Sequence, residues 1–320
     1  MLIHRVLLPL AFFAMLCSGA IAAESNRAMT VENDIAYVPK GDPAQVLDLY
    51  IPTKPSKGPL PLIVWIHGGG WIGGSKANPS ALNMLSSGYA VASVEYRFST
   101  VAKFPAQIQD CQAAIRWLRA NSRKYNIDPD HIGVMGQSAG GHLSALLGTA
   151  GGANAFPPIG GNEKVSDRVQ AVVDMCGPAD FRTVMQQAAA DPTKSGIRFN
   201  TASDYYSNLI GAKLGEDDKS DAVSPVHYVD KKDAPFLILH GTLDPIVPFA
   251  QSAELADALK KAGVNVVFQK LPGTNHAGPG FGFPAVRALI SKFFDKNLKG
   301  ANVKVDELPD SALVPRQPAQ

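Results

Sequence analysis

HIGVMGQSAGGHLSALL, residues 131–147, contains the turn on which the rest of the fold depends. The pattern predicts a short strand at 131–136 and an apolar helix at 139–147, joined by GQSAG, which fits G-x-S-x-G. Such a turn strains the serine backbone, projects its hydroxyl from the sheet edge and places helix amides beside it. A glycine-rich turn with a serine helix cap is the simpler alternative. The strand before and the helix after favour Ser138 as a nucleophile.

A second glycine motif follows another expected strand. Residues 62–66 are a continuous apolar run, typical of a strand buried on both faces, and HGGGW at 67–71 comes directly after it. Attack on an acyl carbonyl develops negative charge on the oxygen, and donors aimed there in advance lower the barrier. Consecutive glycines allow backbone N–H groups to approach that oxygen closely. We therefore expect the amides of Gly69, Gly70 and Ala139 to form an oxyanion hole.

Strand and helix patterns alternate on both sides of these motifs. This alternation predicts an α/β fold with a mostly parallel sheet of about eight strands, helices on both faces, and a site at the carboxyl ends of the strands. The expected strands are 46–51, 62–66, 89–96, 131–136, 169–175, 235–240 and 264–271, and the expected helices are 106–124, 139–147, 250–262 and 284–296.

One domain accounts for these elements. We predict that it covers residues 24–299, with a loose segment at 24–34. Residues 178–232 are polar and weakly periodic, so we interpret them as an insertion of small helices and loops. Residues 300–320 contain three prolines and few large apolar groups, which is typical of a C-terminal tail.

The N-terminus has the pattern of a removed signal peptide. His4 and Arg5 precede an apolar run at 6–17 that is too short to span a bilayer, and Ala20-Ile21-Ala22 offers small residues for cleavage near Ala22. We expect an exported protein, periplasmic or secreted, with no stable membrane anchor. Export permits a disulfide between Cys111 and Cys176, but their contexts favour two buried free thiols.

At this point the sequence resembles the α/β-hydrolases. The likeness is to the esterase/lipase branch with an HGGGW oxyanion motif, and within it to bacterial feruloyl and acetylxylan esterases. It rests on the two glycine motifs, Tyr96-Arg97, Phe104-Pro105 and DCQAAIRW at 110–117, and it extends from about residue 46 to about residue 296. The resemblance implies the α/β-hydrolase fold, ester hydrolysis and a Ser-Asp-His triad.

The chain order of that family is nucleophile, acid, histidine. After the strand at 235–240, Asp244 occupies the position of the family's acid, and His276 follows the last strand at the position of its histidine. Asp174 ends a strand nearer the nucleophile and is the reserve acid. We interpret His240 as structural and His142, on the helix after Ser138, as a packing residue.

The aromatic residues of the insertion have two interpretations. Trp71, Tyr205 and Tyr206, with Phe181, either form the walls of a substrate pocket or pack the insertion onto the sheet. No H-E-x-x-H or paired-cysteine spacing occurs, so neither a metal nor a cofactor is expected. The net charge of +2, without a Lys/Arg-dense stripe, argues against nucleic acid as a ligand.

These observations predict a serine ester hydrolase of small to medium acyl esters. The resemblance and the export signal point to acetyl or feruloyl esters of plant cell walls, free or linked to polysaccharide. Two alternatives remain: a serine peptidase or amidase on the same fold, of the arylformamidase or prolyl oligopeptidase kind, or a non-catalytic binding module. Because such modules tend to lose the serine or the histidine, the occupied triad positions favour an enzyme. The sequence indicates no oligomeric state.

Overall fold

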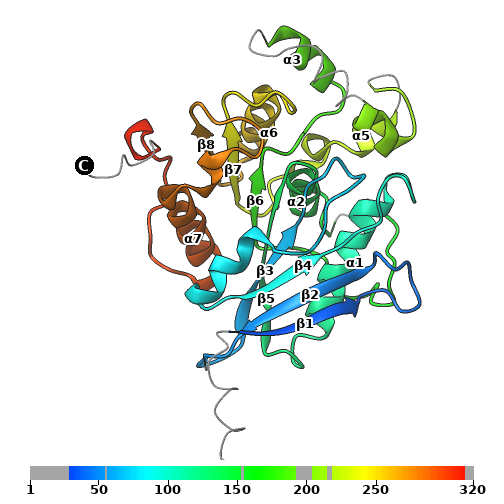
Figure 1. The fold of residues 1–320 in the computed structure, drawn as a ribbon, viewed down its shortest axis with the longest axis vertical. Helices are drawn as coiled ribbons and strands as arrows, with labels where there is room; N and C mark the ends of the chain where they lie inside the picture. Colours follow the sequence, from blue (N-terminus) through cyan, green and yellow to red (C-terminus); the bar gives the residue numbers. More distant parts are fainter. Residues whose placement is uncertain (1–28, 55, 153–154, 192–203, 215–217, 314–320) are drawn as a thin grey trace, which may run out of the picture.

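The computed structural model describes residues 29–54, 56–152, 155–191, 204–214 and 218–313, which form a twisted sheet covered by helices (Figure 1). Within these residues the sheet has eight strands in the order β1-β2-β4-β3-β5-β6-β7-β8. All neighbours from β4 to β8 are parallel, whereas β1 and β2 are antiparallel to their neighbours. The strands are Met29–Ala36 (β1), Val46–Pro52 (β2), Leu60–Ile66 (β3), Ala90–Val94 (β4), Ile127–Gln137 (β5), Ala171–Met175 (β6), Phe236–Gly241 (β7) and Val266–Leu271 (β8).

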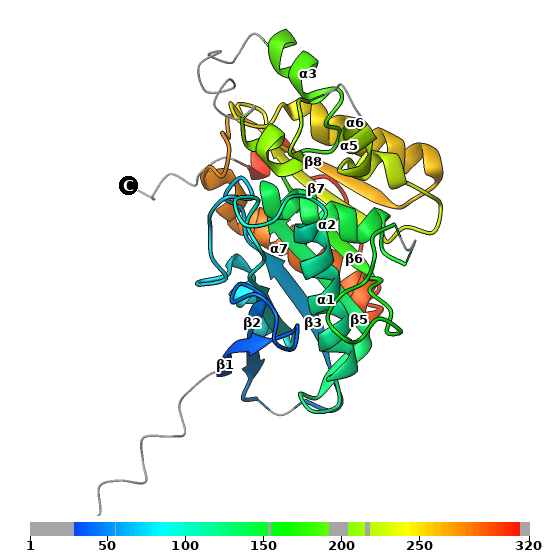
Figure 2. The same ribbon diagram turned by 90° about the vertical axis from the view of Figure 1, so that its right-hand side faces the viewer.

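Helices cover both faces of the sheet. Residues of α1, α2 and α6 pack on one face and residues of α7 and η1 on the other, so that α1 and α2 stand in front of the strands in Figure 2 and α7 behind them. The longer helices are Ala106–Ala120 (α1), Ala139–Thr149 (α2), Phe249–Ala262 (α6) and Pro284–Lys299 (α7), and the 3₁₀ turns that matter here are Ser80–Ser87 (η1) and Pro279–Gly282 (η3).

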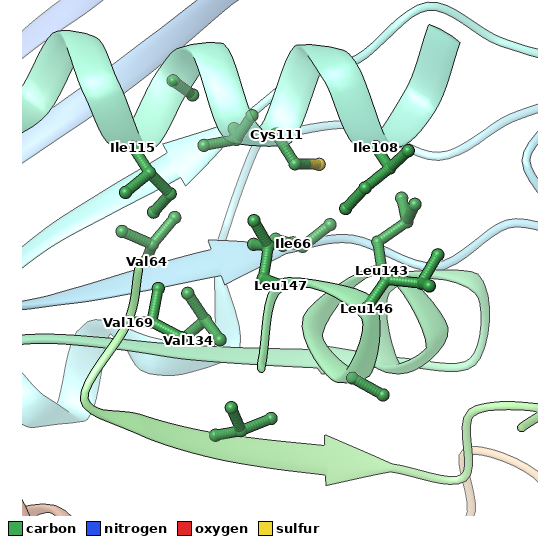
Figure 3. Packing of buried hydrophobic residues seen from close by; sticks show 14 of the residues in the cluster. Val64, Ile66, Ile108, Cys111, Ile115, Val134, Leu143, Leu146, Leu147 and Val169 are labelled. Atoms are coloured by element: carbon green, nitrogen blue, oxygen red, sulfur yellow. The ribbon is translucent and has the colours of Figure 1, made fainter. Parts of the chain in front are cut away.

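The core under α1 shows why these residues form a buried strand and a helix. Val64 and Ile66 of β3 point toward Ile108, Cys111 and Ile115 of α1 (Figure 3), which recur at helical spacing on its inner face. All five side chains are almost completely buried. This packing fixes the carboxyl end of β3, where the HGGGW motif begins.

The edge strand β1 was not expected, because we predicted a loose segment at 24–34. Its side chains are mostly exposed, so it has no apolar alternation to reveal it in the sequence. The strand forms through backbone pairing with β2, from Met29↔Pro52 to Ala36↔Val46. Backbone pairing of this kind depends on a neighbouring strand rather than on side-chain pattern.

The insertion 178–232 contains short helices joined by loops where it is described. These are Val184–Ala190 (α3), helical residues 204–210, Asp218–Ala222 (α5) and Pro225–Tyr228 (η2), and Figure 1 shows α3 and α5 above the sheet. The insertion is joined to α2, because the buried His142 ring donates a hydrogen bond to the Val223 carbonyl at 2.7 Å.

The expected C-terminal tail is in contact with the domain over its described part. Leu313 is buried among residues of α7 and the sheet, and Val305 and Leu308 are half-buried against the same cluster. The Leu308 amide also donates to Gln269 Oε1 of β8 at 2.6 Å. Three apolar side chains therefore hold this segment against the domain, a contact that the composition of the segment did not predict.

The predicted signal peptide, residues 1–22, lies outside the described residues. Among the residues that are described, no helix is both long enough and apolar enough to cross a membrane. Cys111 and Cys176 are both buried and unpaired, as the sequence favoured.

Candidate active site

Ser138 stands on a tight turn that leaves no room for a side chain at position 136 or 140. It joins β5 to α2 with φ 57° and ψ −120°, a conformation that side-chain-bearing residues rarely adopt. A Cβ atom at Gly136 would overlap the Gly140 carbonyl, and one at Gly140 would overlap the carbonyl of Ile66 on β3. Small residues on both sides of the serine therefore let α2 start directly against the sheet, with Ser138 at its N-terminus.

His276 follows β8 and contacts the serine. Its Nε2 lies 2.9 Å from Ser138 Oγ, and its Nδ1 lies 2.7 Å from Oδ2 of Asp244. Because a carboxylate can only accept, Nδ1 carries the hydrogen and donates it to Asp244. Nε2 is then free to accept the hydroxyl hydrogen of Ser138. The structure thus brings together the three residues that the sequence predicted from three different strand ends.

Asp244 is buried and held by donors on both carboxylate oxygens. The amides of Ile246 and Val247 donate to Oδ1 at 2.8 and 2.9 Å. Burial would raise the pKa of this carboxyl group, but hydrogen bonds from His240 and His276 lower it by more, and the net pKa is far below the usual range. Asp244 is therefore a fixed negative charge beneath the His276 ring.

The charge of Asp244 affects the pKa of the His276 ring. Burial lowers the pKa of the imidazole, whereas the neighbouring Cys176 and the Asp244 carboxylate raise it, and the net pKa lies above the ordinary value. The ring thus readily accepts a proton from Ser138. Below its pKa it is already protonated and cannot serve as a base.

His240 has a closer connection to this site than the sequence interpretation allowed. It is completely buried at the end of β7, and its Nε2 lies 3.2 Å from Asp244 Oδ2 and 3.1 Å from the Val247 carbonyl. Its Nδ1 faces the Ser252 hydroxyl of α6 at 2.7 Å. Since both atoms facing Nε2 are acceptors, Nε2 carries the hydrogen and Ser252 donates to Nδ1. The only signal in the sequence was the spacing of four residues between His240 and Asp244.

The glycine loop after β3 carries two of the three amides that we predicted would form an oxyanion hole. Gly69 and Gly70 have φ values of 115° and 61°, and a Cβ at Gly69 would overlap the Gly73 carbonyl. Among the described residues, no oxygen accepts a hydrogen bond from the amide of Gly69 or Gly70. A Cβ at Gly68 would lie 2.8 Å from the Gln137 carbonyl, so the loop is packed against the serine turn. Ala139, at the first position of α2, adds the third amide.

His67 links the start of the glycine loop to Glu95. Its ring lies between the Gly68 carbonyl at 2.7 Å and the Glu95 carboxylate at 2.8 Å, and it stacks on Tyr96 with ring centroids 4.5 Å apart. Glu95 also accepts the Lys76 amide at 3.1 Å. The loop that carries the candidate donors is therefore anchored at its start and again beyond its end.

The aromatic residues proposed for substrate binding have unequal positions. Trp71 and Tyr206 are only 3% and 2% exposed, and their ring centroids are 5.5 Å apart beside Phe181. The Trp71 indole also donates to His142 at 3.3 Å. Trp71 and Tyr206 therefore pack the insertion onto the sheet, as one of the two interpretations held. Tyr205 is half-buried, and a Cβ at Gly70 would lie 3.3 Å from its ring, so Tyr205 covers the glycine loop.

Four residues at this edge of the sheet share an unusual backbone. Trp71, Ser138, Cys176 and Ala277 each follow a different strand and each have φ between 50° and 58°. Positive φ is uncommon in residues with a side chain and costs about 1–3 kcal/mol at each position. The strand ends that surround the serine are therefore strained as a group.

Asp174, the reserve acid, does not contact His276. Its Oδ1 accepts the Gly177 amide at 2.9 Å, and its Oδ2 has no partner among the described residues. Burial raises the pKa of this carboxyl group to about 7, in spite of the opposing hydrogen bond from Gly177. Asp244 rather than Asp174 is therefore paired with the histidine.

One group of metal-ligating atoms occurs in the described part of the chain, formed by Cys176, Asp244 and His276, whose atoms lie within 4.8 Å of one another. Asp244 and His276 already hydrogen-bond to each other. Burial raises the pKa of the Cys176 thiol, which disfavours the thiolate that binds metals. The donor set fits a serine-histidine-aspartate array better than a metal centre.

Comparison with known proteins identifies relatives over most of the chain. The sequence profile of the BD-FAE family matches residues 47–259, a range that includes Ser138 and Asp244 and ends before His276. The esterase LipQ of Mycobacterium tuberculosis is 33% identical over 264 residues, which cover 80% of this chain and 59% of LipQ. The chain thus spans a little more than half the length of the curated relatives that it matches.

Solved structures are similar to this chain over more than four-fifths of its length. A truncated form of a carbohydrate esterase from gut microbiota has 34% sequence identity and a TM-score of 0.76, covering 84% of this chain and 96% of that one. An acetyl ester-xyloside bifunctional hydrolase from Caldicellulosiruptor lactoaceticus has 28% identity and a TM-score of 0.62, covering 82% and 90% of the two chains.

Proposed function

The chain belongs to the BD-FAE family and has the α/β-hydrolase fold, and we propose that it is a serine carboxylesterase with Ser138, His276 and Asp244 as its catalytic residues. One observation carries the proposal: contacts of 2.9 and 2.7 Å link the Ser138 hydroxyl through the His276 ring to the Asp244 carboxylate. The names of LipQ and of the gut carbohydrate esterase support the reaction class.

The geometry supports a two-step acyl transfer. His276 Nε2 accepts the Ser138 proton as Oγ attacks the ester carbonyl, and Asp244 stabilises the imidazolium that forms. The carbonyl oxygen becomes negative and lies against the amides of Gly69, Gly70 and Ala139. Removing one such donor typically costs about 3 kcal/mol of transition-state stabilisation.

The second half restores the serine. His276 gives its proton to the departing alkoxide oxygen, and the alcohol leaves. Water then gives a proton to Nε2 and attacks the acyl group on Ser138, which releases the acid. The same oxyanion donors serve both steps.

For the substrate we propose acyl esters of carbohydrates, including acetyl or feruloyl groups on plant cell-wall polysaccharides. Support comes from the carbohydrate esterase and the acetyl ester-xyloside hydrolase, which are similar to the chain over more than four-fifths of its length. The basic, apolar and small-residue pattern of residues 1–22 supports export, where such polymers occur.

The proposal is tested with purified protein and a nitrophenyl ester series, acetylated xylan, methyl ferulate and a nitroanilide amide. We expect hydrolysis of short acyl esters and of acetylated xylan, and loss of turnover in Ser138→Ala. Ser56→Ala is the matched control, because Ser56 is exposed in the loop between β2 and β3. Full activity in Ser138→Ala would exclude the mechanism, and a preference for the amide or for long acyl chains would exclude the substrate class.

A further inference from the structure

A cavity of about 430 Å³ lies on the face of the sheet that carries α7 and η1. Two of its lining residues are chain neighbours of catalytic residues: Gln137 precedes Ser138, and Ala277 follows His276. The cavity is therefore built from the same two strand ends as the serine and the histidine. Its size lies within the range of about 300–1,000 Å³ that is usual for small-molecule sites.

The position of His276 decides which part of an ester this cavity faces. In the proposed reaction, Nε2 delivers its proton to the oxygen of the departing alcohol, so the alcohol must lie on the His276 side of Ser138. The chain that continues from His276, Ala277 to Gly282, forms one wall of the cavity. On the opposite face of the sheet, space near Trp71 is filled by Tyr206 and Phe181.

The lining of the cavity combines polar groups with an apolar floor. Within the described residues, the Gln137 amide and the Arg287 guanidinium have no side-chain hydrogen bond or ion pair, and both line the cavity with Asn83 of η1. No acidic residue lines it. The floor is formed by buried Met175, Phe281 and Ile290. Amide and guanidinium groups suit hydroxyl groups, and an apolar floor suits the C–H face of a sugar ring.

We propose that this cavity binds the sugar portion of an acylated carbohydrate, with Asn83, Gln137 and Arg287 donating hydrogen bonds to its hydroxyl groups. The inference rests on the proposed function and assigns the alcohol side of that same site. Arg287 projects from the first turn of α7 and Asn83 from η1, so the two donors approach the sugar from separate elements. These side chains then determine the specificity for sugar esters, whereas Ser138 carries out the attack on the ester.

The first test compares two acetates that differ only in the alcohol: a monoacetylated methyl β-xyloside and ethyl acetate. In Asn83→Ala/Arg287→Ala, we expect the ratio of kcat/KM for the xyloside to kcat/KM for ethyl acetate to fall about tenfold or more, because two hydrogen bonds are lost. Both side chains are exposed, so the substitutions remove no core packing. Arg123→Ala is the matched control, since Arg123 is exposed beyond the end of α1 and should leave the ratio unchanged.

The second test measures binding without turnover. The acetylated xyloside is titrated calorimetrically into Ser138→Ala and into the same variant with Asn83→Ala/Arg287→Ala, where we expect Kd to rise about tenfold or more. An unchanged ratio together with an unchanged Kd would overturn the assignment of the cavity. If the wild-type protein hydrolyses neither acetate, the proposed function fails, and the titration still decides whether the cavity binds the sugar.

Discussion

His240 provides the sharpest test of how the charge at the site is arranged. The buried Nε2–H of His240 lies 3.2 Å from Asp244 Oδ2, the same oxygen that accepts the His276 hydrogen at 2.7 Å. Replacing His240 with Leu removes this donor at similar volume. Replacing it with Gln keeps an N–H near the position of Nε2, so the pair of variants separates the hydrogen bond from the packing.

The magnitude follows from that bond. A hydrogen bond to a charged group contributes about 1.5–3 kcal/mol, and a 3.2 Å bond shared with the Val247 carbonyl belongs at the low end of this range. Without the bond, Asp244 is a stronger acceptor and stabilises the protonated form of His276. About 1.5 kcal/mol corresponds to a rise of at most about one unit in the pKa of His276.

The sign of the pH effect is fixed by the role of the base. His276 must be neutral to accept the Ser138 proton, so kcat/KM rises with pH through the pKa of His276. In His240→Leu we expect this acidic limb to move to higher pH, giving up to about a tenfold loss below the limb and little loss on the alkaline plateau. His240→Gln should keep the wild-type profile.

The assay is kcat/KM for p-nitrophenyl acetate between pH 6 and pH 11, a range that includes the raised pKa of His276, about 10. Hydrolysis without protein is subtracted, and thermal unfolding of each variant is measured at the same pH values. A limb that stays in place, or a loss in His240→Leu that is equal at every pH, would refute the link from His240 through Asp244 to His276. A shift of the limb in His240→Gln as large as in His240→Leu would refute it as well.

Three further predictions concern other parts of the site. Asp244→Asn should lower kcat by about 10³–10⁴-fold, because the amide favours the wrong His276 tautomer; a loss below tenfold would contradict the role of Asp244. Gly69→Ala should lower kcat about 10²–10³-fold, since its Cβ would displace the loop, whereas Gly88→Ala, at φ 80° in open space, should change kcat little, and equal losses would contradict the oxyanion assignment. Asp174 has a folded pKa of about 7 against about 3.9 unfolded, so its contribution favours the fold below pH 4 and is lost as pH rises to about 7. Urea unfolding should therefore show Asp174→Asn gaining stability relative to wild type between pH 5 and pH 8, and no relative gain would contradict the buried, protonated Asp174.

The sequence predicted the fold class well because the central strands and helices have clear hydrophobic patterns. Buried parallel strands read as apolar runs and their covering helices as periodic stripes, so the predicted α/β-hydrolase fold is confirmed. The strand β1 was missed, because its exposed side chains carry no pattern and its backbone pairing with β2 is not visible in composition. The contacts of Leu308 and Leu313 were missed because isolated apolar residues show neither a helical nor a strand period.

The sequence predicted some residues of the candidate site and left the positions of others open. Ser138 lies in a motif between a strand and a helix, and the resemblance to the α/β-hydrolases pointed to Asp244 and His276 after two later strands. A parallel sheet brings the carboxyl ends of its strands to one edge, where the three residues meet. Whether Trp71 and Tyr206 face a ligand or the core depends on how the insertion folds back, and neither interpretation has a distinct spacing. We interpreted His240 as structural because it lies at a strand end, and a linear sequence does not show that its Nε2 contacts Asp244.

The four positive-φ residues after β3, β5, β6 and β8 set a trade-off between stability and activity. At about 1–3 kcal/mol each, their combined cost is comparable to the whole net stability of a typical domain, about 5–15 kcal/mol. Glycine would relieve much of this cost at Cys176 or Ala277. Selection for heat resistance alone should therefore enrich glycine at these two positions, whereas the serine hydroxyl that performs the attack keeps Ser138 fixed.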